Sequence, residues 1–347
     1  MKPTILALFI AILSACSPSE PAPLRPAFFY WETSLEITPS EQALLDSLGN
    51  PKIYVKILDI GKNAQNGGIE PYSRTPILAD GPLGKKSFTP CIFITNEVFD
   101  GISESKTIWL AEKIQTCWPP DSLDWHELLI DCDWTPSTRA AFFHFLEKLR
   151  DYLPPNCTLS ATIRLHQYKF PKNTGVPPVD RGMLMFYNTG DVDEEGTHNT
   201  VFHPEDASKY VLGAPKNYAL PLDLALPLFT WGLVFREGEL WKIIPGPLPL
   251  NEMRSNGKWR EHPATQPFEA TLWEVQDGTF LGGHYLRPGD RLRLSATTPE
   301  LLMEAATWAK KLDLAPDAHL VFFHLGVANS AHFSAQLLDS VCNTVRK

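Results

Sequence analysis

The chain has 347 residues, of which 44% are hydrophobic and 20% are charged, and its formal net charge is −9 at pH 7. This composition is typical of a packed globular protein, and the length suits either one barrel or two smaller domains. The negative charge argues against nucleic acid as a partner and against electrostatic attachment to anionic lipid.

The N-terminus has the features of an export signal. Lys2 precedes an almost unbroken apolar run, which ends in the tetrapeptide Leu-Ser-Ala-Cys at Cys16. A charged start, a short apolar core and small residues before a cut site predict a secretory signal peptide over 1–15. The cysteine resembles the lipobox of bacterial lipoproteins, in which this residue is acylated and becomes the new N-terminus. We therefore expect acyl chains on Cys16 to hold the protein at a membrane of the cell envelope.

The segment 16–26 is expected to be a tether. After the cysteine it reads SPSEPAPLRP, with four prolines that disfavour helix and favour an extended form. Ser17 is not the aspartate that often marks lipoproteins retained at the inner membrane, which favours the outer membrane as the location. The residues 27–347 contain no second apolar span, and we expect them to form one barrel-like domain.

Short apolar runs alternate with amphipathic stretches along this domain. Strands are expected at 27–31, 53–60, 91–95, 128–133, 159–166, 182–187, 224–235 and 320–325. Helices are expected at 40–48, 106–117, 137–152, 205–211 and 299–312. Continuous apolar strands that alternate with helices indicate an α/β fold with a parallel sheet covered on both faces. Eight strands favour a (β/α)₈ barrel, and a doubly wound open sheet plus a small β-domain is the alternative, because periodicity does not show closure.

The span 236–298 breaks this alternation. It is rich in Pro, Gly and Trp, and the runs 270–275 and 291–295, with a turn at 287–290, indicate antiparallel strands. We expect a late β-rich insertion in the barrel.

In a (β/α)₈ barrel, the residues at the C-terminal ends of the strands face the functional site. The sequence IDCDWT at 130–135 places Asp131 and Asp133 on one face of a strand and Cys132 on the other. Paired carboxylates raise one pKa unless a cation intervenes. Arg164, on the next strand, is expected to pair with one aspartate, with His166 nearer the mouth. Alternatively, one aspartate caps the following helix and the other pairs with an arginine.

Other strands also end in polar or aromatic residues. These are Trp31, Glu32, Asp59, Tyr187, Asn188, Trp231 and His324. Together they predict a mouth of carboxylates, amides and indoles, which is typical of a carbohydrate cleft. In a hydrolase, Asp131 or Asp133 acts as nucleophile or base and Glu32 or Asp59 as acid. Trp31, Trp231 and Tyr187 then stack on sugar rings, and Arg164 and His166 orient the carboxylates.

The IDCDW strand resembles the catalytic-strand motif of the chitinase-like glycoside hydrolases, in which aspartates at alternate positions precede a glutamic acid. Asp131 and Asp133 match the aspartates, and the position of the acid falls on Thr135. More broadly, IYVKILDI, LLIDCDWTPSTR, SATIRLHQ, TGVPPVDRGMLMFYN and ALPLFTWG resemble a family of bacterial lipoproteins, of no established activity, that looks related to barrel glycoside hydrolases. The resemblance implies a barrel and a lipoprotein.

Two functions stay open at this point. The favoured one is a non-catalytic surface lipoprotein that binds glycan or an envelope partner. The alternative is a glycoside hydrolase with Asp131 and Asp133, which needs carboxyl groups ~5–5.5 Å apart for retention or ~6.5–9.5 Å for inversion. A metal-assisted reaction at these aspartates and His166 has less support, because no HExxH or cysteine-rich spacing accompanies them. We expect no cofactor and no metal.

Overall fold

The structure is a computed structural model that describes residues 24–346 except 79, 84–85, 121 and 327–332. The export signal, Cys16 and most of the expected tether lie outside the described residues. The first strand begins at Arg25, so the last two tether residues belong to the barrel instead. Within the described ranges, no helix has the length and apolar character needed to cross a membrane.

Eight parallel strands form a closed barrel. They are β1 (Arg25–Tyr30), β2 (Lys52–Lys62), β4 (Phe88–Ile94), β5 (Glu127–Asp131), β6 (Thr158–Arg164), β7 (Arg181–Met185), β8 (Leu222–Pro227) and β16 (His319–Phe323). The sheet closes because β1 pairs on both sides: Phe28 lies opposite Phe322 of β16 and Ile53 of β2. The predicted (β/α)₈ barrel is confirmed, and the open-sheet alternative is wrong.

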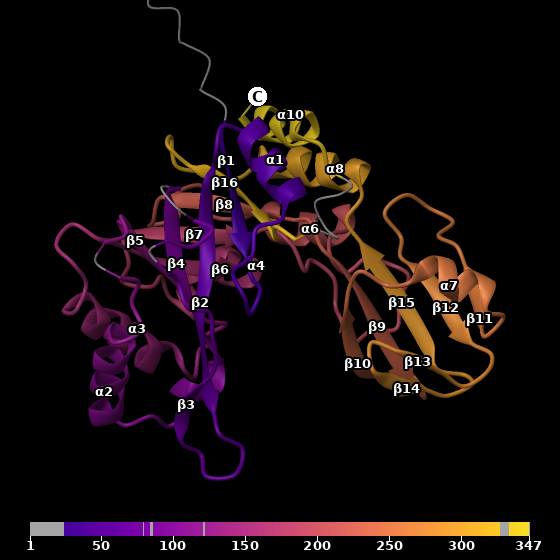
Figure 1. Cartoon of the computed structure of the whole chain (residues 1–347), viewed down its shortest axis with the longest axis horizontal. Coiled ribbons are helices and arrows are strands. Elements are labelled where there is room, and N and C mark those ends of the chain that lie inside the picture. Colours follow the sequence, from indigo (N-terminus) through magenta and orange to yellow (C-terminus); the bar gives the residue numbers. More distant parts are fainter. Residues whose placement is uncertain (1–23, 79, 84–85, 121, 327–332, 347) are drawn as a thin grey trace, which may run out of the picture.

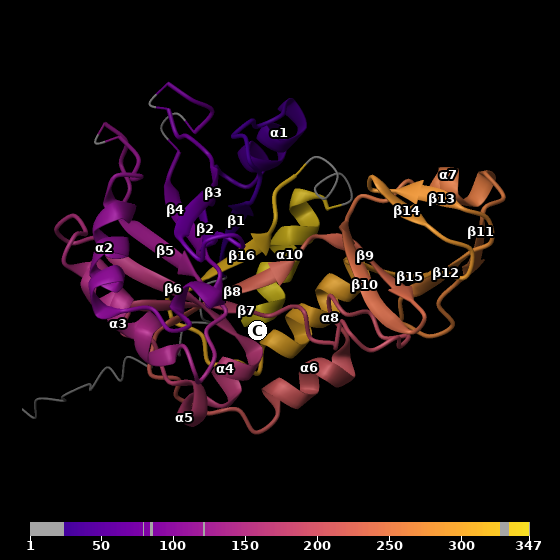
Figure 2. The same ribbon diagram turned by 90° about the horizontal axis from the view of Figure 1, so that it is seen from below.

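Helices cover the outside of the barrel. They are α1 (Pro39–Ser47), the 3₁₀ helix η1 (Asn96–Phe99), α2 (Glu104–Gln115), α3 (Arg139–Arg150), α4 (Leu165–Lys169), α5 (Pro171–Thr174), α6 (Pro204–Val211), α8 (Pro299–Ala309) and α10 (Ala335–Arg346). α2 packs beside α3, and α8 contacts both α6 and α10 (Figure 2). Between β2 and β4 the described residues have a strand, β3 (Ile69–Arg74), antiparallel to β2.

The alternation of side chains along each strand creates two apolar layers. Phe28 packs outward in the large core between barrel and helices, and its neighbour Phe29 points into the barrel with Tyr54 and Leu129. Because both faces of the strands are buried, their sequences are continuous apolar runs. This is why the strands could be located from the sequence.

The insertion forms a separate antiparallel sheet beside the barrel (Figure 1). Its strand order is β10-β9-β15-β12-β11, and it has its own apolar core around Trp273 and Leu292. Its elements are β9 (Thr230–Arg236), β10 (Glu239–Pro245), α7 (Leu250–Ser255), β11 (Trp259–His262), β12 (Thr271–Val275), the hairpin β13 (Thr279–Leu281) and β14 (His284–Leu286), and β15 (Arg291–Ala296).

One expected strand is two strands. The run 224–235 divides at Leu228 and Phe229 into β8 of the barrel and β9 of the insertion. Both halves are apolar because each lies in a core, and no glycine marks the change of direction between them. The insertion sheet therefore begins at Thr230, six residues before the expected boundary.

Candidate functional site

A cavity of about 890 Å³ opens at the C-terminal ends of the barrel strands. Three parts of the chain form its wall. The strand ends contribute Trp31, Asp131, Asp133, Arg164, Met185, Tyr187 and Phe323; the segment after β1 contributes Glu32, Glu36 and Glu41; and the insertion contributes Trp231, Ile243, Pro245, Gly246 and Pro247.

Asp131 and Asp133 both line this cavity, and Cys132 between them packs in the outer core. The alternation of the β5 strand therefore continues past its last hydrogen-bonded residue. The two carboxylates differ in environment, because the Asp131 side chain is 6% exposed and the Asp133 side chain is 52% exposed. Neither caps α3, whose N-cap residue is Thr138. The expected alternative of an aspartate as helix cap is therefore wrong.

Arg164, at the end of β6, holds the two aspartates together. Its Nε and Nη2 atoms both donate to the carboxylate of Asp133, with Nη2 at 3.1 Å from Oδ2. Nη2 also lies 3.9 Å from Oδ1 of Asp131. Burial lowers the pKa of Arg164, but the two carboxylates outweigh it and raise the pKa above its usual value. The guanidinium therefore stays charged, and the predicted contact with the aspartates is present.

The pKa of the Asp131 carboxyl lies above the usual value for an aspartate. Burial raises its pKa, the guanidinium of Arg164 lowers it, and the neighbouring Asp133 raises it again. The Thr162 hydroxyl donates to Asp131 Oδ1 at 2.6 Å, which also favours the charged form. The net effect is a raised pKa, because removal from water costs the anion more than its two partners restore.

Aromatic rings also line the cavity. The ring of Phe323 lies at the centre, with centroid distances of 5.6 Å to Trp31, 5.4 Å to Tyr187 and 5.8 Å to Phe229. Trp231 continues this row from the insertion, at 5.4 Å from Phe229. The rings pack against one another through edge-to-face and tilted contacts, so this part of the wall is apolar.

Three more of the predicted residues, Glu32, Asn188 and His324, also line the cavity. Glu32 is half-exposed, and its Oε1 lies 3.9 Å from Nδ1 of His324. Burial lowers the pKa of His324, which favours the neutral imidazole. Asn188 lines the cavity beyond β7, with its backbone N–H bonded to the carbonyl of Val201 at 2.8 Å.

Two predicted site residues are not in the cavity wall. Asp59 is buried on β2, where its Oδ2 accepts a 2.8 Å bond from Lys56 Nζ. His166 is exposed on α4, because β6 ends at Arg164 and the chain turns at once into a helix. The Gln167 side chain caps this helix by accepting from the Arg164 N–H at 2.7 Å. The expectation that the strand extends to His166 is therefore wrong.

The cavity also contains residues that sequence reasoning missed. Phe229 and Phe323 carry no polar group, and within apolar runs they resemble core residues. Ile243 and the Pro245–Pro247 segment come from the insertion, whose position against the barrel no local pattern reveals. Lys56, next to the cavity, places its Nζ 5.6 Å from the centroid of the Trp31 ring. The sequence signal that could have identified Lys56 is the presence of a lysine inside an otherwise apolar strand.

The architecture of this chain is similar to that of two chitinases and one spore cortex-lytic enzyme of known structure. The chitinase from Chromobacterium violaceum aligns with a TM-score of 0.53 at 11% identity, covering 93% of this chain and 98% of that one. The spore cortex-lytic enzyme SleL from Bacillus megaterium aligns with a TM-score of 0.52 at 14% identity, covering 95% and 76%. The chitinase from Rhizomucor miehei aligns with a TM-score of 0.51 at 13% identity, covering 93% and 99%.

No protein-family model matches the sequence, and no curated protein sequence matches it significantly. The structural likeness shows the fold alone: the chain forms a (β/α)₈ barrel similar to the barrels of these chitinases. The relation to barrel glycoside hydrolases that the IDCDW motif implied is confirmed at the level of the fold.

Proposed function

We propose that this protein binds glycan in the barrel cavity, at the surface of a bacterial envelope membrane, without hydrolysing it. The observation that carries the proposal is the pairing of a row of aromatic rings with a charged wall in one cavity of about 890 Å³. Sugar rings offer apolar faces to aromatic side chains and hydroxyls to carboxylates and guanidinium groups. Trp31, Tyr187 and Trp231 provide the first kind of contact, and Asp133 and Arg164 provide the second.

We infer the absence of hydrolysis from Thr135, which stands where the chitinase-like motif has its glutamic acid. A threonine hydroxyl is too weak an acid to protonate a leaving group at neutral pH. Its Oγ1 lies 2.8 Å from the hydroxyl of Ser137 and 3.2 Å from that of Thr138, in the turn before α3. Thr135 is also not part of the cavity wall.

The envelope location follows from the N-terminal sequence. An acylated Cys16 leaves eight residues before the barrel begins at Arg25, and an extended chain of that length spans about 25 Å. This is long enough to lift the barrel off the headgroups and short enough to keep it at the membrane. The serine after Cys16 supports the outer membrane.

Glycoside hydrolysis is the second candidate, and the raised pKa of Asp131 favours it. A buried carboxyl that retains its proton can serve as a general acid, and an ionised neighbour such as Asp133 can stabilise positive charge on a sugar. Against it, Arg164 already engages Asp133 through two bonds.

Calorimetric binding and product analysis on the same samples separate the two candidates. The full chain in detergent is titrated with chitin oligosaccharides and with solubilised envelope glycan, and the mixtures are then searched for shortened products by mass spectrometry. We expect binding without products, and loss of binding in Trp31→Ala. Trp109→Ala, on the outer face of α2, is the matched control and should bind like the wild type.

The aspartates decide the remaining question. In a binder, Asp131→Asn leaves affinity within a few-fold and no variant changes the product profile. In a hydrolase, the wild type shortens the glycan and Asp131→Asn or Asp133→Asn stops it while the protein still folds. A wild type that binds none of the glycans tested, or one that shortens them, overturns the proposed function.

A further inference from the structure

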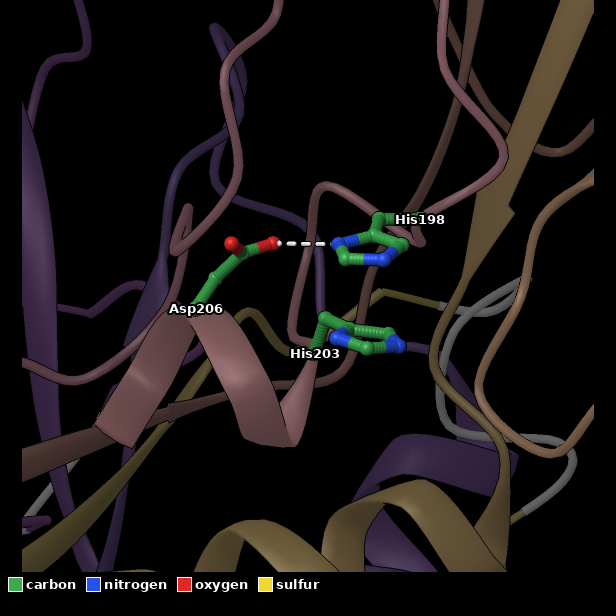
Figure 3. A group of neighbouring side chains, drawn as sticks. All are labelled: His198, His203 and Asp206. Carbon is green, nitrogen blue, oxygen red and sulfur yellow. Dashed lines mark hydrogen bonds and ion pairs between the residues drawn. The ribbon is translucent and has the colours of Figure 1, made fainter. Parts of the chain in front are cut away.

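A second cluster of polar side chains lies outside the cavity wall, where the segment after β7 meets α6. It consists of His198, His203 and Asp206, each of which offers one ligand atom within 4.8 Å of the other two (Figure 3). The two imidazole rings lie face to face, with centroids 3.7 Å apart and planes inclined by 12°. The Asp206 carboxylate lies at their edge, with Oδ2 at 2.9 Å from Nδ1 of His198.

His203 supplies an independent sign that something else binds there. The residue is 7% exposed, and its Nδ1 is buried without a hydrogen-bond partner among the described atoms. An orphaned buried nitrogen is costly unless a ligand satisfies it. Figure 3 shows the two rings stacked with the carboxylate of Asp206 beside them. The local chain imposes this arrangement, because His203 precedes the first turn of α6 and Asp206 lies within that turn.

We propose that His198, His203 and Asp206 bind a divalent transition-metal ion of the zinc class, with water completing the coordination. Two imidazole nitrogens and one carboxylate oxygen are a donor set that suits Zn²⁺ and its neighbours better than Ca²⁺ or Mg²⁺. Three protein ligands and an open position are the arrangement of zinc sites that retain a water.

The geometry requires a small rearrangement that the surface position of His198 allows. Zn²⁺ bonds of ~2.0–2.2 Å place tetrahedral ligand atoms about 3.3 Å apart. The ligand atoms of the three residues lie within 4.8 Å of one another here, which is a wider limit than the ion requires. A metal also lies in the plane of each imidazole, so the stacked rings must turn apart. The His198 side chain is 41% exposed and can rotate, whereas His203 and Asp206 are held by burial.

The charge around the cluster suits a cation in one respect and opposes it in another. Burial, and then the neighbouring His198, lower the pKa of His203, so its imidazole is available in the neutral form that binds metal. Lys209, in contrast, donates to Asp206 Oδ1 at 2.6 Å and competes for the carboxylate. Its side chain is exposed, so it can move away at little cost.

A metal here would join three parts of the chain. His198 forms an isolated bridge with Glu269 of the insertion, and Thr200, two residues later, accepts a 3.1 Å bond from Trp231 Nε1. Asp206 anchors the same point to α6. A bound ion should therefore stabilise the docking of the insertion on the barrel, independently of any glycan.

Zinc binding by the full chain, purified in detergent and stripped with a chelator, tests the proposal. Equilibrium dialysis with elemental analysis measures the ions bound per chain, and competition with a chromophoric chelator gives the affinity. We expect about one Zn²⁺ per chain, visible absorption bands when Co²⁺ is added to the stripped protein, loss of these bands when Zn²⁺ displaces Co²⁺, and a higher melting temperature in zinc. Ca²⁺ and Mg²⁺ should not compete.

Ligand variants locate the site. His198→Gln and Asp206→Asn should each weaken zinc binding by about 100-fold or more, since removing even an outer-shell partner costs about 10–100-fold. Lys209→Met, which removes the competing cation, should strengthen it severalfold. His126→Gln is the matched control, because His126 also faces a carboxylate at 3.0 Å, at an exposed position.

The outcomes are decisive in each direction. His203→Gln tests the buried ligand, and if it does not fold, the exposed His198→Gln still decides. The proposal is overturned if the wild type takes up no stoichiometric zinc, or if His198→Gln and Asp206→Asn bind it as tightly as the wild type and His126→Gln do.

Discussion

Replacing Arg164 by methionine removes the cation that holds Asp131 and Asp133 together. Breaking a largely buried ion pair by removing one partner costs about 3–5 kcal/mol of unfolding free energy. Asp133 is 52% exposed and regains water, and Asp131 can take up a proton, so the loss should lie near about 3 kcal/mol at neutral pH. Arg150→Met is the matched control. Arg150 pairs with Asp180 on the surface, with side chains 41% and 46% exposed, and its loss should cost less than about 1 kcal/mol.

The cost of Arg164→Met should also depend on pH. Asp131 has a folded-state pKa above its unfolded value, so its contribution to stability is highest below the unfolded pKa and falls as pH rises through the folded pKa. Without Arg164, no guanidinium opposes the effects of burial and of Asp133, so the pKa of Asp131 rises further. The variant should therefore be most destabilised at high pH and approach the wild type as pH falls, by about 1.4 kcal/mol per unit of additional shift.

Urea unfolding of the full chain between about pH 5 and about pH 8, followed by tryptophan fluorescence, measures both effects. The double variant Asp131→Asn/Arg164→Met should recover part of the loss, because the buried carboxyl is gone. The reasoning fails if Arg164→Met costs no more than Arg150→Met, or if its cost is the same at both ends of this pH range.

Three further predictions concern the anchor and the insertion. Cys16→Ala should move the protein from the membrane to the soluble fraction, as judged by fractionation and the mass of the N-terminal peptide; a membrane-bound variant contradicts the lipid anchor. Trp231→Phe keeps the ring but loses the bond to Thr200, so the urea midpoint should fall by an amount equivalent to about 0.5–1.5 kcal/mol; no change would show that the bond is not needed. Gly246→Ala places a Cβ 2.7 Å from a backbone oxygen and should cost about 1–3 kcal/mol, whereas Gly196→Ala, whose Cβ would have its nearest neighbour at 4.0 Å, should stay within about 0.5 kcal/mol; equal costs would refute the packing argument.

Much of the barrel could be predicted because its strands are buried on both faces. A strand such as β2 or β5 then appears as an unbroken apolar run, and a helix between two such runs shows its own periodicity. Part of the candidate site could also be predicted, from the alternation of side chains along a strand. Asp131 and Asp133 occupy alternate positions, and Arg164 ends the next strand, so their meeting required only that the two strands be neighbours.

The errors arose where a local pattern has two solutions. The run 224–235 is equally apolar as one strand or as two, and only the pairing of β9 with β10 and β15 separates them. His166 follows Arg164 with the right alternation for a strand, but Gln167 is positioned to cap a helix there. Asp59 ends an apolar run like the other candidates, and its burial beside Lys56 depends on a bulge in β2.

The sequence by itself determined the alternation of strands and helices and the acidic strand end, because each depends on residues close together in the chain. The export signal with its cysteine stays a prediction from the sequence. Only the tertiary structure decided closure of the barrel, the aromatic wall and the approach of the insertion to the cavity. It also brought Trp231 against Thr200 and His198 against Asp206. The periodicity of a sequence indicates which face of a helix or strand is buried. Packing between parts of the chain that are distant in sequence determines which segment covers that face.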